Sequence, residues 1–295
     1  MAQTITPSLW FAEGAGEAID HYVAVFDPVV PGGARVTATS HYPTEGLSDA
    51  QKSFAGQVLT VDFEIGGVAL TAINGGPAFR PNPAISFSLA LPDRAAVTAV
   101  WAALSDGGRV LMELGPYPFS ELYGWVEDRH GVSWQLALAG ADAAPGPAVT
   151  PSLLFTGDAV GRAEEALRRY VAVFGGAVGT LATYPEPTGP AAAGDLMYGD
   201  AQVGGSRLAA MDSGAVMDTP FSPAISFVVA CDGQEELDRV WGELSRVPEA
   251  ERCGWCQDEF GVSWQVVPSN LGDLLQRPGA YAALMGMGRI VIADL

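Results

Sequence analysis

Lysine and other basic residues are scarce in this sequence. Lys52 is the one lysine among 295 residues, and 15 basic residues stand against 34 acidic ones, which gives a formal net charge of −19. A surface this acidic repels nucleic-acid phosphates and anionic lipids. The charge could also attract a cationic ligand, or it could serve only solubility. We therefore expect neither nucleic acid nor a membrane as a partner.

Long apolar runs and cysteines are also few. No apolar stretch reaches the roughly 18 residues that span a bilayer, and MAQTITPSLWF at the start lacks the basic and apolar regions of a signal peptide. We therefore expect a cytoplasmic protein. Three cysteines argue against a disulfide scaffold. Cys253 and Cys256 form a C-x-x-C motif, but on a strand they would lie about 10 Å apart on opposite faces. We expect no redox or zinc role for them.

The chain contains two copies of one unit. Hydrophobic residues make up 48% of the sequence, enough for packed cores, and the length suits two domains. Several segments return in the same order: ITPSLWF as VTPSLLF, HYVAVF as RYVAVF, PAISF unchanged, and GWVEDRHGVSWQ as GWCQDEFGVSWQ. A period this long indicates a duplicated domain and excludes a solenoid. We place the domains at 1–139 and 149–268, a flexible linker at 140–148, and a tail at 269–295.

Hydrophobic periodicity predicts an α+β fold. Residues 5–11 indicate a strand and 15–26 an amphipathic helix, and VLTVDFEI at 58–65 alternates with period two before a glycine turn. The pattern then restarts with a strand at 84–91 and a helix at 93–108 that begins at a capping aspartate. Each domain is therefore expected to consist of two βαβββ modules, and the second copy is expected to fold in the same way.

At this point the sequence resembles a known family. TPSLWF, HYVAVF, TAINGGP, PAISF and GWVEDRHGVSWQ are similar to the PhnB-like branch of the vicinal oxygen chelate superfamily. That superfamily includes glyoxalases and bleomycin-resistance proteins, and this branch is often labelled 3-demethylubiquinone-9 3-methyltransferase. The resemblance implies two tandem glyoxalase/bleomycin-resistance-like domains, with sheets that curl around pockets. It also implies pairing into an internal pseudo-dimer, and a homodimer is a further option.

The resemblance also identifies where metal ligands would stand. Gln135 and Gln265 take the place of the ligand glutamate of metal-dependent relatives. The other ligand positions fall near Thr6 and Thr150, near Ala84 and Ala224, and near Asn74 and Asp212. A catalytic zinc usually has three protein ligands and a water, and neither copy supplies three. We therefore expect no metal and no other cofactor.

The polar strand faces complete the candidate ligand site. Asp62 and Glu64 either face solvent or line the pocket, where one of them could act as a general base. Trp134 and Trp264 are expected in the core, whereas Trp125 and Trp255 could stack on a ligand. The candidate ligand-binding residues are Thr6, Ser8, Trp10, Asp62, Glu64, Asn74, Ser86, Trp125, Gln135, Ser152, Asp200, Asp212, Ser226, Trp255 and Gln265.

Three functions remain open at this stage. The first is metal-free binding or sequestration of a small molecule. The second is an enzyme, either a metal-dependent lyase, isomerase or dioxygenase, or a metal-free acid–base catalyst. The third is a scaffold with vestigial pockets. Methyl transfer is not expected, because the glycine-rich turn of a Rossmann-type cofactor site would have to lie within a parallel sheet.

Overall fold

The computed structural model describes residues 4–47, 49–140 and 147–295. Most of the predicted linker at 140–148 therefore lies outside the described residues, as do the first three residues of the chain. Within the described part, no helix is long and apolar enough to cross a membrane.

The first repeat forms eight strands and two long helices. Its elements are β1 (Ile5–Phe11), α1 (Ala15–Phe26), β2 (Ala34–His41), η1 (Asp49–Phe54), β3 (Val58–Ile65), β4 (Val68–Asn74), β5 (Ile85–Leu91), α2 (Arg94–Ser105), β6 (Arg109–Tyr117), β7 (Ser120–Glu127) and β8 (Ser133–Leu138). The predicted helix at 15–26 is confirmed, and α2 begins where predicted because the Asp93 carboxylate accepts a hydrogen bond from the Ala96 N–H at 2.8 Å.

The second repeat and the tail follow. Their elements are β9 (Val149–Phe155), η2 (Gly157–Ala159), α3 (Ala163–Phe174), β10 (Gly176–Thr183), β11 (Leu196–Val203), β12 (Ser206–Asp212), β13 (Ile225–Cys231), α4 (Gln234–Leu244), η3 (Pro248–Ala250), β14 (Trp255–Gln257), β15 (Ser263–Pro268), α5 (Leu271–Leu274), α6 (Ala280–Met285) and η4 (Ile292–Asp294).

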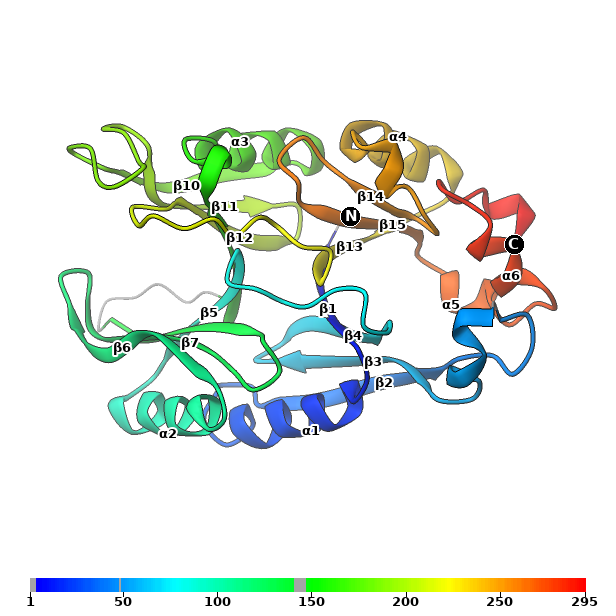
Figure 1. The fold of residues 1–295 in the computed structure, drawn as a ribbon, viewed down its shortest axis with the longest axis horizontal. Coiled ribbons are helices and arrows are strands. Elements are labelled where there is room, and N and C mark those ends of the chain that lie inside the picture. The colour runs from blue at the N-terminus through cyan, green and yellow to red at the C-terminus, as the bar shows by residue number, and fades with distance from the viewer. Residues whose placement is uncertain (1–3, 48, 141–146) are drawn as a thin grey trace.

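Each of the two sheets takes strands from both repeats. The seven-stranded sheet has the order β14-β15-β13-β1-β4-β3-β2, and the eight-stranded sheet has the order β10-β11-β12-β9-β5-β8-β7-β6. The repeats join where β1 pairs antiparallel with β13, and where β5 pairs antiparallel with β9. In Figure 1 the helices of the first repeat lie along one side of the molecule and those of the second repeat along the other, with both sheets between them. The α+β fold of tandem domains is confirmed.

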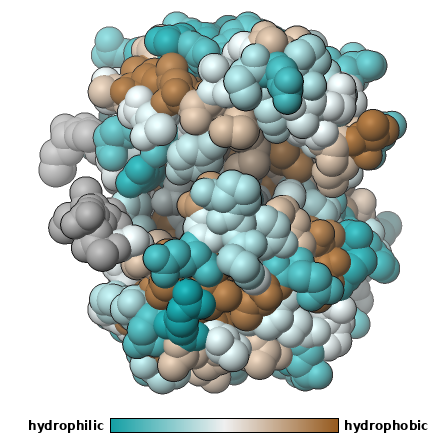
Figure 2. All heavy atoms as spheres, turned by 90° about the vertical axis from the view of Figure 1, so that its left-hand side faces the viewer, coloured by the Kyte–Doolittle hydropathy of each residue, from teal (hydrophilic) through white to brown (hydrophobic). Residues whose placement is uncertain are grey.

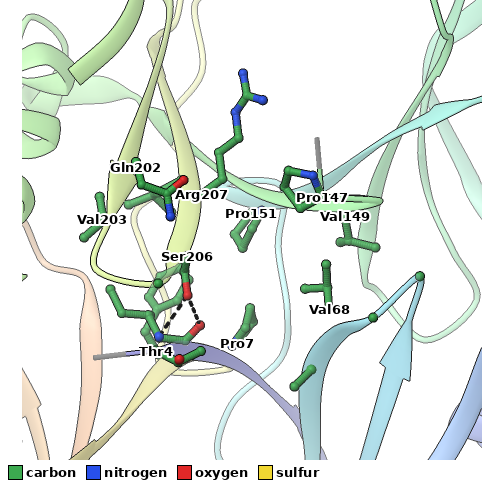
Figure 3. Close-up of a pocket in the computed structure, with 17 residues that line it drawn as sticks. Thr4, Pro7, Val68, Pro147, Val149, Pro151, Gln202, Val203, Ser206 and Arg207 are labelled. Atoms are coloured by element: carbon green, nitrogen blue, oxygen red, sulfur yellow. Dashed lines mark hydrogen bonds between the residues drawn. The ribbon is translucent and has the colours of Figure 1, made fainter. Parts of the chain in front are cut away.

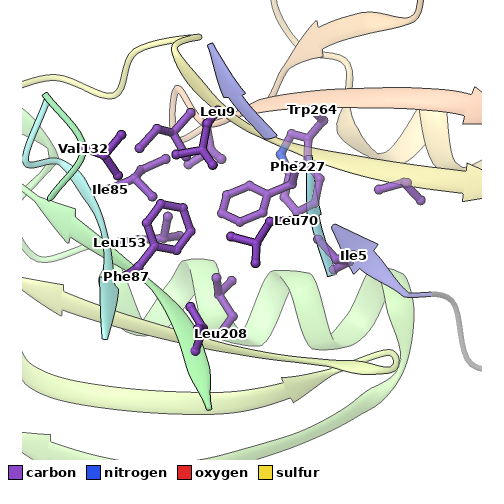
Figure 4. Packing of buried hydrophobic residues seen from close by; sticks show 14 of the residues in the cluster. Ile5, Leu9, Leu70, Ile85, Phe87, Val132, Leu153, Leu208, Phe227 and Trp264 are labelled. Carbon is purple, nitrogen blue, oxygen red and sulfur yellow. The ribbon is translucent and has the colours of Figure 1, made fainter. Parts of the chain in front are cut away.

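The backs of the two sheets face each other across the centre of the molecule. Figure 4 shows Leu9 and Phe227 of the seven-stranded sheet beside Phe87 and Leu153 of the eight-stranded sheet, and all four are at most 1% exposed. Burial of each such side chain stabilises the fold by about 1.5–3 kcal/mol. We call the opposite face of each sheet its front face.

The twice-repeated segment surrounds a buried carboxylate. Asp128 accepts hydrogen bonds from the Tyr22 hydroxyl at 2.6 Å and from the Trp134 indole at 2.8 Å, and also from two backbone N–H groups of its own turn. Asp258 does the same with Tyr170 and Trp264 in the second repeat. The segment therefore recurs because each repeat ties its first helix to its last strand through one aspartate. The predicted core positions of Trp134 and Trp264, both fully buried, are confirmed.

The expectation that the second copy folds in the same way is wrong at one edge. The segment between the shared Leu-Ser and Gly-Trp pairs is much shorter in the second repeat, at 246–253 against 106–123, and it forms the short η3 helix in place of β6. The tail occupies part of the position beside β14 that β6 has beside β7 in the first repeat. The Cys253 N–H donates to the Met287 carbonyl at 2.7 Å, and the Gly254 N–H donates to the Gly288 carbonyl at 2.8 Å. Figure 1 shows α5 and α6 beside η1 at this end of the molecule.

Candidate functional site

The strand register identifies which predicted residues share the front face of the seven-stranded sheet. Directly opposed residues of neighbouring strands point to the same face. Ser8 opposes Ser226 and Thr71, and Thr71 opposes Asp62. Thr6 lies in the next row, which runs through Val228 to Gln265 and Trp255. The structure thus brings together eight predicted residues on this face: Thr6, Ser8, Trp10, Asp62, Glu64, Ser226, Trp255 and Gln265.

Five other predicted residues share the front face of the eight-stranded sheet. They are Ser86, Trp125, Gln135, Ser152 and Asp200. The sequence pattern suggests one pocket per repeat, but the sheet topology separates the residues of each repeat. Because β1 pairs with β13 and β5 with β9, each front face combines residues of both copies.

Asn74 and Asp212 do not reach either front face. Asn74 accepts a hydrogen bond from the Ala15 N–H at 2.9 Å and donates to the Val58 carbonyl at 3.0 Å. Asp212 accepts hydrogen bonds from the backbone N–H groups of Gly161, Ala163 and Leu196 at 2.8–3.2 Å. Burial raises the pKa of Asp212, and these hydrogen bonds oppose the rise. Both side chains therefore hold the start of a helix against the last strand of a hairpin.

The donor set does not fit a divalent metal. Asn74 and Asp212 face away from the glutamines of the front faces, and the nearby positions of the resemblance carry hydroxyl and methyl groups. Among the described residues, no three His, Cys, Asp or Glu side chains are grouped as metal ligands. A neutral amide binds a divalent cation more weakly than a carboxylate does. We therefore derive no chemistry through a metal.

The polar groups on the eight-stranded front face are paired with each other. Gln135 donates to Ser86 Oγ at 2.7 Å and accepts from the Tyr123 hydroxyl at 2.8 Å. The Trp125 indole donates to Ser133 Oγ at 2.6 Å. Asp200 forms an ion pair with Arg207 at 2.5 Å and accepts a hydrogen bond from the Thr180 N–H. Ser152 Oγ is the exception, since it is buried and has no partner within the described residues.

Three matching groups on the seven-stranded front face have no hydrogen-bond partner among the described residues. Gln265 donates to Ser226 Oγ at 3.0 Å, but its carbonyl oxygen accepts no hydrogen bond from the described residues. The Trp255 indole N–H and the Asp62 carboxylate have no partner in that part of the chain either, and all three side chains are partly exposed.

Two substitutions between the repeats account for the difference at Gln265 and at Asp62. Cys253 stands where the first repeat has Tyr123, directly before the shared Gly-Trp pair. Because Gln135 accepts its hydrogen bond from the Tyr123 hydroxyl, Gln265 has no equivalent donor beside it. Ala69 stands where the second repeat has Arg207, because Ala69 opposes Glu64 as Arg207 opposes Gln202. The guanidinium that Asp200 holds therefore has no equivalent beside Asp62.

Two tryptophans reach toward each other over the seven-stranded front face. Trp10 on β1 and Trp255 on β14 are three strand spacings apart, about 14 Å in a flat sheet. Their ring centroids nevertheless lie 5.9 Å apart at an interplanar angle of 80°. Phe79 packs edge-on against the other side of Trp10, and the Trp10 indole donates to the Gly76 carbonyl at 2.7 Å. The two side chains therefore lean toward each other over the front face. We call the part of this face that they border, from Gln265 to Asp62, the seven-stranded cleft.

The tail borders this cleft and links the two repeats. The Gln51 side chain of η1 donates to the Tyr281 hydroxyl of α6 at 3.0 Å, and the Cys253 sulfur lies 3.6 Å from the Met285 sulfur. Leu274, Ala280 and Leu284 of the tail are buried. Sequence patterns did not point to Gln51 or Tyr281, because neither belongs to a repeated motif.

The opposite end of the molecule presents the eight-stranded sheet. Figure 2, seen from the side of β6 and β10, shows a hollow between the two repeats. Phe119 is 68% exposed on the hairpin between β6 and β7, where it stacks on Tyr117 and packs edge-on against Tyr123. Tyr123 is the hydrogen-bond donor to Gln135, and burial raises the pKa of Tyr123 well above its usual value, so Tyr123 stays protonated and keeps Gln135 satisfied.

Two cavities lie away from the front faces. One, of about 340 Å³, lies where the repeats meet, and Figure 3 shows Pro7, Pro151, Val68 and Val149 around it. The Ser206 hydroxyl in its wall is already paired, because Ser206 Oγ accepts a hydrogen bond from the Ile5 N–H and donates one to the Ile5 carbonyl, both at 2.9 Å. The other, of about 320 Å³, lies beside Leu154 and Phe221 at the ends of β9 and β14.

Comparison with known proteins identifies the family. The sequence profile of the 3-demethylubiquinone-9 3-methyltransferase family matches residues 3–137 and again residues 147–267. The chain belongs to this family. A PhnB protein of this type from Bacillus cereus is 31% identical, and the alignment covers 46% of this chain and 100% of that protein, with a TM-score of 0.40. A search among curated proteins found no match.

A second solved structure shows the fold over nearly the whole chain. Glyoxalase I from Zea mays aligns with 96% of this chain and 97% of its own, with a TM-score of 0.53 at 14% identity. This PhnB-like protein therefore has the tandem glyoxalase fold of the vicinal oxygen chelate superfamily. The comparison shows the fold and not a shared activity.

Proposed function

We propose that this PhnB-like protein binds a small organic molecule in the cleft on the front face of the seven-stranded sheet, without a metal ion. One observation carries the proposal: the Gln265 carbonyl, the Trp255 indole N–H and the Asp62 carboxylate face the same cleft and lack partners among the described residues. A hydrogen bond contributes about 0.5–1.5 kcal/mol net between neutral groups and about 1.5–3 kcal/mol to a charged group. A ligand that pairs with these partly exposed groups gains that free energy.

Binding or sequestration explains these groups better than catalysis does. An amide, an indole and hydroxyls can orient a ligand by hydrogen bonds. A metal-dependent lyase, isomerase or dioxygenase would need a ligand set that the front-face residues do not form. Asp62 would be the general base of a metal-free enzyme, but its carboxylate makes no hydrogen bond to an acid or nucleophile among the described residues. The scaffold hypothesis leaves the unpaired groups without a role.

The family description names a methyl transfer, which we do not propose for this chain. A cofactor site of the Rossmann type lies at the carboxyl ends of parallel strands, at a glycine-rich turn before a helix. The sheets here consist of βαβββ modules with antiparallel hairpins, and QVGGSRLAAMDSG forms the β11–β12 hairpin.

A thermal-shift screen with paired variants tests the proposal. Protein treated with a chelator is screened against neutral, cationic and anionic aromatic compounds. A ligand at 100 times its dissociation constant raises the stability by about 2.7 kcal/mol. We expect hits whose shift is lost in Gln265→Met and kept in the matched Gln135→Met. Hits that require added metal, or that respond to Gln135→Met alone, would refute the proposal, as would a screen without hits.

A further inference from the structure

We infer that the ligand of the seven-stranded cleft is an organic cation, an amine or quaternary ammonium compound with an apolar body. This inference rests on the proposed function and gives its ligand a chemical class. It joins three features of the cleft: an aromatic corner, a carboxylate two strands from β1 that has no partner among the described residues, and an alanine on β4 where the matching strand of the other sheet carries an arginine.

The aromatic corner has the geometry that attracts cations. The Trp10 and Trp255 rings meet at 80°, so a group lodged in the corner lies over the face of one ring and beside the edge of the other. The face of an indole carries negative charge density, and a cation within about 6 Å of it gains about 0.5–2 kcal/mol. Both tryptophans are partly exposed, so their faces can be reached from the cleft.

Asp62 supplies the countercharge. It stands in the row of Ser8, two strand spacings from β1, which is about 10 Å. A cation held in the corner therefore lies roughly one Debye length from this carboxylate, so the two attract each other and added salt weakens the attraction. The residues between them, Thr71 and Ile73, are partly exposed and present one hydroxyl and one apolar surface to the body of the ligand.

The matched position on the other sheet shows what satisfies such a carboxylate. Asp200 holds the Arg207 guanidinium, which is a cation supplied by the protein itself. In the seven-stranded cleft Ala69 replaces that arginine, and the neighbouring basic residue, Arg35, is already paired with Glu64. Asp62 and Ala69 therefore occupy the positions of the Asp200–Arg207 ion pair, but without a cation from the protein.

The charge of the whole chain acts in the same direction. A net charge of −19 raises the local concentration of cations and lowers that of anions at the surface. Anionic ligands would approach against this field, and the cleft offers an anion no unpaired guanidinium or ammonium group from the described strands that form it.

A pair of probes that differ only in charge tests the inference. Choline and 3,3-dimethylbutan-1-ol have nearly the same shape, but only choline is charged. Titrations of both, and of benzyltrimethylammonium, are followed by calorimetry or by the NMR signals of the indole N–H groups. We expect both cations to bind at least tenfold more tightly than the neutral alcohol, with an affinity that falls as salt is added.

Three variants test whether the cations bind beside Asp62. Ala69→Arg gives Asp62 the partner that Asp200 already has, and we expect at least tenfold weaker cation binding. Asp62→Asn should have the same effect, whereas the matched Asp200→Asn should leave cation binding unchanged. Thermal unfolding shows that each variant folds, and Ala69→Arg, at an exposed position, serves if Asp62→Asn does not.

The outcomes separate this inference from the proposed function. Equal binding of choline and the neutral alcohol, or cation binding that survives Ala69→Arg, would overturn the cation inference. If a neutral or anionic compound then binds and is lost in Gln265→Met, the proposed function stands with another class of ligand. If no class of compound binds, both proposals fall.

Discussion

Trp10 and Trp255 belong to different repeats, yet their rings pack edge to face with centroids 5.9 Å apart. The contact exists because β1 of the first repeat pairs with β13 of the second, which carries β15 and β14 beside it. Neither repeat contains this aromatic corner by itself. The proposed ligand site therefore requires both repeats.

Trp255→Phe should weaken ligand binding with little loss of stability. The change keeps an aromatic ring but removes the indole N–H, which has no partner among the described residues. Loss of one hydrogen bond to the ligand corresponds to about 1 kcal/mol, or roughly fivefold in affinity. Calorimetric titration of a screening hit measures the change.

The matched variant Trp125→Phe should behave in the opposite way. It leaves Ser133 Oγ without its donor in a buried network, which should cost about 1 kcal/mol or more of folding free energy. Binding of the same hit should not change. A change of affinity in Trp125→Phe would show that the ligand binds on the eight-stranded sheet, which contradicts the proposed site.

Asp212→Ala should destabilise the protein without affecting binding. The carboxylate accepts backbone hydrogen bonds from Gly161 and Ala163 at the start of α3 and from Leu196 at the start of β11, away from the cleft. We expect a loss of roughly 2–3 kcal/mol in urea denaturation. Asn74→Ala is the control in the first repeat, and it should also lower stability. A specific loss of ligand affinity in either variant would restore these residues to the binding site.

Stability should fall as the pH rises through the titration of Asp258. Burial raises the pKa of Asp258 to about 6, although hydrogen bonds from Trp264 and Tyr170 oppose the rise. An unfolded aspartate titrates near about 3.9. The folded state therefore binds this proton more tightly than the unfolded chain does, and its contribution is fully present below about pH 4 and lost above about pH 6. The expected change is up to about 3 kcal/mol.

Denaturation of the wild type and of Asp258→Asn across this pH range measures that contribution. The variant cannot ionise at this position, so the difference in unfolding free energy between the two proteins should change between pH about 4 and 6. A constant difference would show that Asp258 is ionised throughout.

Tyr281→Phe should loosen the tail from the first repeat. The variant loses the hydrogen bond from Gln51, which is a link between α6 and η1. A loss of about 1 kcal/mol should raise the amide exchange rates of α6 roughly fivefold and shorten the residence time of a bound ligand. Unchanged exchange in α6 would show that its apolar contacts hold the tail without this hydrogen bond.

Much of the fold follows from the sequence, because the features that specify it are local or repeated. The helix at 15–26, the hairpin around the glycine turn at 66–67, and the cap at Asp93 depend on neighbouring residues. The cores around Trp134 and Trp264 are visible as repeated segments. The exchange of strands between repeats is not visible in this way, since the same strands could pair within each copy.

The candidate site is harder to predict for the same reason. Alternation placed Ser8, Trp10, Asp62 and Gln265 on polar faces, but it could not show which of them share a sheet. The informative positions are those where the repeats differ, such as Cys253 against Tyr123 and Ala69 against Arg207. These residues matter because of the hydrogen bonds and ion pairs that they make with other strands. A short sequence pattern does not contain both partners of such an interaction.

The most direct test of the account observes the tryptophans themselves. Protein labelled with 5-fluorotryptophan is titrated with the strongest screening hit, and the fluorine signals are assigned with Trp→Phe variants. We expect the signals of Trp10 and Trp255 to shift together and saturate at one ligand per chain, while the signal of Trp125 stays in place. A shift of the Trp125 signal without those of Trp10 and Trp255 would contradict the proposed cleft.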